Sequence, residues 1–136
     1  MRNPLTSRLP ALVALGLAAL GTVAARADAP RLVVTPLLRT QPSGEPALEA
    51  VIAHGEFAPG ASTGRHTHPG DEYAYVLEGT LELLVDGHEP RRVAAGEAYH
   101  NPRGVVHETR NVGVGIARVA STFVVDRGAP LLQPAR

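Results

Sequence analysis

The chain has 136 residues, with 13 arginines, no lysine, 13 acidic residues and no cysteine, so its formal net charge is zero. The absence of cysteine excludes disulfides, thiolate metal sites and thiol nucleophiles, and the absence of lysine excludes Schiff-base chemistry. Histidines, carboxylates and tyrosines remain as the groups that could carry a reaction, alone or with a metal ion.

The first segment has the composition of a targeting sequence. Arg2 and Arg8 are followed by an apolar run of 17 residues over 9–25, which ends in small residues. This pattern is typical of a secretory signal peptide. We therefore predict a signal peptide over residues 1–27, cleaved after Ala27, and a periplasmic or secreted protein. The alternative, an uncleaved anchor, is disfavoured because 17 residues are marginal for crossing a bilayer.

Cleavage after Ala27 would remove 27 of the 136 residues and leave 109, over residues 28–136. That length fits a single small domain with one core. Three of the 13 arginines would leave with the signal peptide, so 10 arginines would face 13 acidic residues. A mildly acidic chain without a basic run is a poor match for nucleic acid. We expect no nucleic-acid partner and no membrane contact in the mature form.

Short apolar segments separated by glycine and proline make up the rest of the chain. They cover residues 32–38, 50–57, 73–77, 81–85, 98–100 and 116–125. Asp86-Gly87 is the strongest hairpin signal between them. No helical pattern of twelve residues follows Ala27. The chain is therefore predicted to be all-β, as a small barrel or sandwich.

Several of these segments are apolar on both faces, most clearly residues 73–77 and 119–125. An isolated sheet normally leaves one face polar. We expect a homodimer to cover the second face, with the early strand 31–38 laid across the partner. The alternative is that loops or the tail, residues 129–136, cover it.

Two stretches concentrate potential metal ligands. Alternate side chains of a strand share a face, so His66 and His68 should point the same way, and Glu72 keeps that parity. His107 would arrive from a neighbouring strand, on one face with Thr109. Imidazole and carboxylate donors suit iron, manganese, nickel, copper or zinc, and disfavour calcium and magnesium. We predict a site for one divalent transition metal.

These residues resemble the two signature motifs of the cupin superfamily. The first motif, G-x5-H-x-H-x3,4-E-x6-G, is matched over residues 60–79, and the second, G-x5-P-x-G-x2-H-x3-N, over residues 96–111. The resemblance implies a conical β-barrel of the double-stranded β-helix, or jelly-roll, type. It also implies a metal held by four protein ligands, His66, His68, Glu72 and His107.

The family resemblance does not select a reaction, since cupins include oxygenases, isomerases, storage proteins and sugar-sensing modules. A metal with four protein ligands keeps open positions, so our leading hypothesis is a metal-dependent dioxygenase acting on a small organic substrate. Glu72 would then be the catalytic residue, as a displaceable ligand and base. The alternatives are a non-oxidative isomerase, decarboxylase or lyase that uses the metal as a Lewis acid, and a non-catalytic binding module.

Other residues near the motifs are weaker candidates. Tyr73, Tyr75 and Tyr99 flank the motifs, and their expected role is packing or dimer contact. His54 and His100 could move protons if they faced the metal cavity. Arg65 and Arg103 could hold an anionic substrate at the mouth, although a surface role is the simpler interpretation. Because the chain has only two phenylalanines and three tyrosines, we expect a small polar or acidic substrate.

Overall fold

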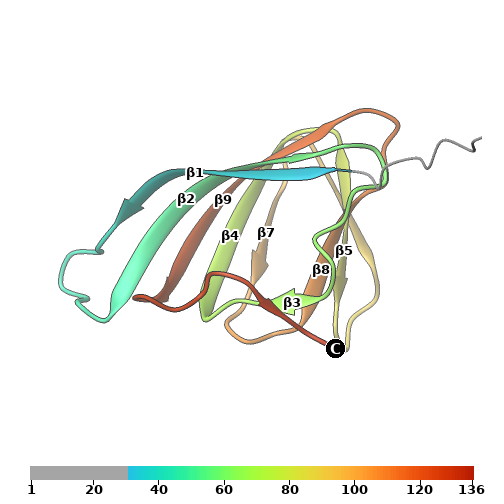
Figure 1. Cartoon of the computed structure of the whole chain (residues 1–136). Helices are drawn as coiled ribbons and strands as arrows, with labels where there is room; N and C mark the ends of the chain where they lie inside the picture. The colour runs from blue at the N-terminus through green and yellow to red at the C-terminus, as the bar shows by residue number, and fades with distance from the viewer. Residues whose placement is uncertain (1–30) are drawn as a thin grey trace, which may run out of the picture.

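The computed structural model describes residues 31–136, so the predicted signal peptide lies outside the described residues. The described part contains ten strands and no helix, and therefore no helix that could cross a membrane (Figure 1). The strands are β1 (Leu32–Thr40), β2 (Leu48–Phe57), β3 (His66–Thr67), β4 (Gly70–Glu78), β5 (Thr80–Val85), β6 (Arg91–Ala94), β7 (Ala98–Asn101), β8 (His107–Asn111), β9 (Ala117–Asp126) and β10 (Gln133–Pro134). The prediction of an all-β chain is confirmed.

The strands form two sheets of five, and every pairing is antiparallel. The first sheet has the order β1-β2-β9-β4-β7 and the second has the order β10-β3-β8-β5-β6. In Figure 1 the long strands of the first sheet lie side by side, with β3, β8 and β5 beyond them. The late strand β9 is inserted between β2 and β4, so segments far apart in the sequence form the middle of the first sheet.

The alternation of buried and exposed side chains along the long strands shows which face of each strand points to the interior. In β2, β4 and β9 buried residues alternate with more exposed ones, as expected where one sheet face packs on another. One buried cluster includes Phe57, Val76, Leu81 and Val119. A second cluster consists of Val51, Ala53, Phe123 and Val125. The inward positions of β4 include Glu72, so the same alternation that builds the core carries a carboxylate into it.

Gly70, the first residue of β4, has a packing role that no other residue could fill. It pairs with Val125 of β9, and a Cβ atom there would lie 2.0 Å from the carbonyl oxygen of Val124. That distance is far inside van der Waals contact. Glycine therefore allows β4 to run closely along β9 and places Glu72, two residues later, opposite Phe123.

The strand predictions located the six apolar segments and missed the more polar ones. The hairpin predicted at Asp86-Gly87 is present, since β5 and β6 pair on either side of it and Gly87 has a φ of 80°. Strand β6 has no apolar run, because Val93 is its one buried residue. The short strand β10 was also missed, since two residues cannot show a period.

The outward face of β4 carries large hydrophobic side chains. Tyr73, Tyr75 and Leu77 are 50%, 48% and 49% exposed. The C-terminal segment does not cover them, because its strand β10 pairs with β3 in the other sheet. The interpretation in which the tail covers this face is therefore wrong, and the homodimer stays a prediction.

Candidate metal centre

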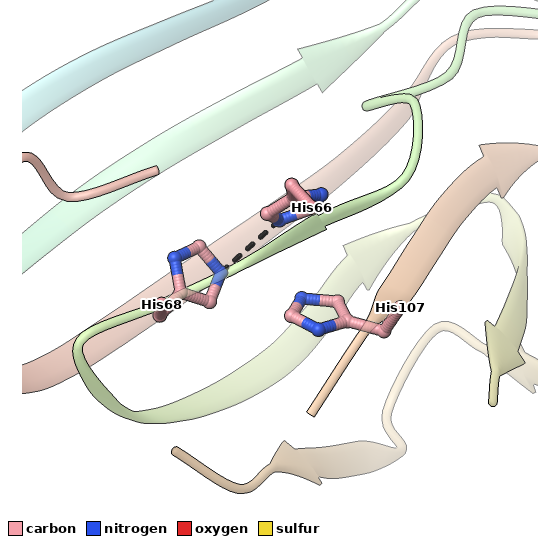
Figure 2. A group of neighbouring side chains, drawn as sticks. All are labelled: His66, His68 and His107. Carbon is pink, nitrogen blue, oxygen red and sulfur yellow. Dashed lines mark hydrogen bonds between the residues drawn. The ribbon is translucent and has the colours of Figure 1, made fainter. Parts of the chain in front are cut away.

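Three histidines from the two motifs meet inside the fold. His66 on β3 pairs directly with His107 on β8, and His68 follows β3. Their side chains point toward one another (Figure 2). One ring nitrogen from each lies within 4.8 Å of the others, and the residues are 3%, 2% and 4% exposed, respectively. The structure thus positions three buried imidazoles to bind a metal ion.

Each of the three rings is oriented by a backbone carbonyl at its Nδ1 atom. The partners are Gly64 for His66 at 2.9 Å, Val105 for His107 at 2.9 Å, and Leu131 for His68 at 2.6 Å. A carbonyl oxygen can only accept a hydrogen bond, so each Nδ1 carries the proton. The Nε2 atom is then the one that faces the centre, which is the usual arrangement of a metal-bound histidine and its supporting group.

The Nε2 atoms lack the partners that they would need without a cation. His66 Nε2 lies 3.1 Å from His68 Nε2, and two neutral imidazoles with Nδ1–H groups would bring lone pairs together there. Within residues 31–136, His107 Nε2 is buried without any hydrogen-bond partner. Burial lowers the pKa of His66 more than its carbonyl bond to Gly64 raises it, which favours the neutral ring. This donor set fits a divalent transition metal.

Glu72 lies beside the three rings as a carboxylate. Its Oε2 atom is 3.4 Å from His68 Nε2 and 3.6 Å from His107 Nε2. Asn101 Nδ2 donates to Oε2 and Ser121 Oγ donates to Oε1, both at 2.8 Å. These two hydrogen bonds favour the ionised carboxylate. The site thus has one negative charge.

The four residues named from the sequence are therefore neighbours in space. The predicted inward parity of His66, His68 and Glu72 agrees with their burial, and His107 faces inward with Thr109, as expected from its strand. Their assignment as the four ligands of one metal stays a prediction.

A cavity of about 240 Å³ lies against the centre. His66, His68 and Glu72 form one part of its wall, and most other lining side chains are apolar. These come from β1, β2, β9 and the C-terminal segment: Leu32, Val34, Ala53, Phe57, Val119, Phe123, Leu131 and Leu132. Tyr99 also lines the cavity. Burial, and next the charge of Glu72, raises the pKa of its hydroxyl, so Tyr99 remains a neutral phenol.

Two histidines that could have served as proton carriers do not reach this cavity. Among the described residues that line it, neither His54 nor His100 occurs. On β7 the buried residues are Tyr99 and Asn101, so His100 points outward; its Nε2 is 3.1 Å from Asp71 Oδ1 and its ring stacks on Tyr73. His54 likewise follows the buried Ala53 on β2. The idea that they face the metal is wrong, because strand parity turns them away.

The two arginines considered for substrate binding are engaged on the surface. Arg65 makes a bidentate ion pair with Asp86, in which both N–O distances are 2.8 Å. Arg103 makes a similar pair with Asp126 at 2.7 and 2.9 Å. In the part of the chain that the structure describes, no arginine lines the cavity. The surface interpretation therefore holds for both.

Sequence reasoning missed the residues that support the site. Asn101 was not named from the sequence, yet its alternation with the buried Tyr99 could have shown that it faces inward. Ser121 was detectable as a polar residue at an inward position of an otherwise apolar strand, β9. The carbonyl of Leu131 had no sequence signal, because any residue has a carbonyl and the contact spans 63 positions.

Comparison with known proteins identifies relatives of this fold and site. The family model described as Cupin domain matches residues 53–125. The tetracenomycin polyketide synthase protein TcmJ of Streptomyces glaucescens is 40% identical over 79 residues, which cover 57% of this chain and 52% of that protein.

Two of the similar solved structures are of named enzymes. A recombinant oxalate oxidase in complex with glycolate superposes with a TM-score of 0.59 at 27% identity, over 76% of this chain and 54% of that one. The dimethylsulfoniopropionate lyase DddQ of Ruegeria pomeroyi gives 0.58 at 26% identity, over 74% of this chain and 50% of that one. The match thus spans about half the length of each of these relatives.

Proposed function

The chain belongs to the cupin superfamily, and from that premise we propose that it is a metal-dependent dioxygenase that acts on a small organic molecule bound beside the metal. The observation that carries this proposal is the combination of three buried imidazoles, oriented by carbonyls at Nδ1, with a cavity on which two of them open. Donors that only stabilised the fold would not need such a cavity.

His66, His68, His107 and Glu72 would hold the metal. When bound, a divalent transition metal with four protein ligands supplies open positions for substrate and dioxygen, together with Lewis acidity. The apolar walls of the cavity support the oxygenase reading, because dioxygen is an apolar gas and the same walls keep water away from the centre.

Glu72 is the proposed base. Its two oxygens each accept one hydrogen bond, from Ser121 and from Asn101, and these bonds hold the carboxylate toward the histidines. A carboxylate oxygen retains a further lone pair, with which Glu72 could accept a proton from a bound substrate. Tyr99, a neutral phenol in the same cavity, is a second group that can donate a hydrogen bond to substrate.

A non-oxidative lyase is the second candidate, and the likeness to the lyase DddQ favours it specifically. The same donor set would then act as a Lewis-acid centre, and Glu72 would again be the base. The two proposals differ in whether dioxygen is consumed.

Oxygen uptake by the metal-loaded protein tests the proposal. A panel of small enols, ketones and hydroxy acids is offered with stoichiometric iron, manganese, nickel, copper or zinc, and uptake is followed together with substrate loss. The dioxygenase proposal predicts uptake that falls at least about tenfold in Glu72→Gln and is unchanged in the outward-facing variant His54→Ala. Substrate loss without oxygen uptake would favour the lyase, and metal binding without turnover would favour a binding module.

A further inference from the structure

We infer that the cavity takes a substrate with one oxygen-rich, metal-chelating end and an apolar body, and that it rejects di-acids. This inference rests on the proposed function and names the substrate class of the same site. It replaces the expectation, made from the scarcity of aromatic residues, of a small polar or acidic substrate.

The lining of the cavity consists of a few donor groups and a larger apolar part. His66, His68 and Glu72 are the donor groups that lie together. The inward faces of β2 and β9 contribute Ala53, Phe57, Val119 and Phe123, all nearly fully buried. Leu32 and Val34 of β1 and Leu131 and Leu132 of the C-terminal segment complete these apolar walls. A bound molecule thus meets donor atoms at one end and hydrocarbon along its length.

Much of the polar lining is already occupied by protein partners. Thr63 Oγ1 donates to the carbonyl of Gly64 and accepts the amide of Thr109, both at 3.0 Å. Ser121 Oγ donates to Glu72. Tyr99 and Thr109 are the remaining uncharged polar side chains of the cavity. These walls therefore offer few groups to hydrogen-bond a polar substrate body.

The lack of positive charge in the walls disfavours a second acid group on the substrate more strongly than the lack of hydrogen-bonding groups does. The sequence has no lysine, and among the described residues that line the cavity there is no arginine. The two arginines considered for this role, Arg65 and Arg103, are paired with Asp86 and Asp126. One carboxylate could be neutralised by the metal, but a second one against the buried apolar side chains of β2 and β9 would lack a cation, which is strongly unfavourable.

Size limits the apolar body. A cavity of about 240 Å³ lies below the range of roughly 300–1,000 Å³ usual for drug-sized ligands. A short alkyl chain or a single ring therefore fits the walls better than a fused polycyclic system.

Binding of matched chelators to the cobalt(II)-substituted protein tests the inference without any turnover. Acetohydroxamate and hexanohydroxamate carry the same chelating group and differ in the length of the apolar tail. Adipic monohydroxamate has the chain length of hexanohydroxamate and ends in a carboxylate, so it is the matched probe with a second acid group. The visible spectrum of cobalt(II) reports occupancy. We expect hexanohydroxamate to bind at least about tenfold more tightly than acetohydroxamate, and adipic monohydroxamate to bind more weakly than hexanohydroxamate.

Equal affinities of acetohydroxamate and hexanohydroxamate, or tightest binding of adipic monohydroxamate, would overturn the inference while leaving the metal site intact. Failure of the protein to bind cobalt would instead overturn the proposed function. A charge added to the wall gives a second test. Leu132→Arg, at a position 44% exposed, should reduce the preference for the apolar tail and strengthen the binding of adipic monohydroxamate. Leu77→Arg, at an outward position 49% exposed, should change neither.

Discussion

At the residue scale, the centre depends on which nitrogen of each histidine is free. Three separate carbonyls take the Nδ1–H groups, so the rings cannot turn without losing a hydrogen bond in a buried place. Such bonds to buried groups are costly to break. The orientation of the donors is therefore a property of the folded protein, already present before any metal binds.

The pH dependence of the metal-free protein follows from His66. Its pKa is lowered from 6.5, mainly by burial. As the pH falls below about 6.5, the unfolded chain binds a proton that the folded protein does not, so stability must decrease. Urea unfolding after treatment with a chelator, at pH 8, 6 and 4.5, should show this decrease. Unchanged stability across the series would contradict it.

At the element scale, the C-terminal segment connects the metal site to the substrate cavity. Its strand β10 pairs with β3, the Leu131 carbonyl holds His68, and the side chains of Leu131 and Leu132 line the cavity. One short stretch of chain thus positions a predicted metal ligand and closes the space beside it.

Removal of residues 129–136 should lower metal affinity about tenfold or more, the usual cost of losing a group that supports a metal ligand. Competition with a fluorescent zinc chelator measures this. Deletion of Arg136 alone is the matched control, because it leaves the Leu131 carbonyl and the bond from the Ala135 amide to Arg65 in place. Equal affinity of the full chain and the longer deletion would show that the Leu131 carbonyl has no part in orienting His68.

Sequence patterns predicted the parts of the structure that rest on local periodicity. Alternation placed His66, His68 and Glu72 on the inward side, and the apolar runs located the long strands. Contacts between residues far apart in the sequence could not be predicted from local periodicity. The pairing of Ser121 with Glu72 joins residues 49 positions apart, and the carbonyl of Leu131 is invisible in any side-chain pattern. His54 and His100 were left open as proton carriers, and the buried neighbours Ala53, Tyr99 and Asn101 show that both lie on the outward side of their strands.

At the scale of the whole molecule, the exposed outward face of β4 is the basis for the predicted homodimer. Tyr73, Tyr75 and Leu77 are each about half exposed, and contiguous apolar surface of this kind commonly marks an interface. We expect a homodimer in sedimentation equilibrium at micromolar concentration, and a shift toward monomer in Tyr75→Lys with the metal content unchanged. The matched control is Val114→Lys, at a fully exposed loop position. A substitution of Arg91 would not serve as a control, because Arg91 lies beside the same tyrosines. A monomeric wild-type protein would contradict the expectation.

Export, predicted from residues 1–27, decides where the protein would acquire its metal. Protein recovered from the cell envelope should begin at Asp28 by mass spectrometry, and a start at Met1 would contradict cleavage. This material is also the proper sample for identifying the metal, since it would be loaded in its own compartment.

The most direct test of the account is elemental analysis of untagged protein, with thermal unfolding measured on the same samples. We predict close to one equivalent of a transition metal in the wild type, and loss of both the metal and thermal stability in His66→Ala and His107→Ala, while His88→Ala on the surface retains both. Unchanged metal content in the two centre variants would contradict the assignment of His66 and His107 as ligands, and with it the proposed function.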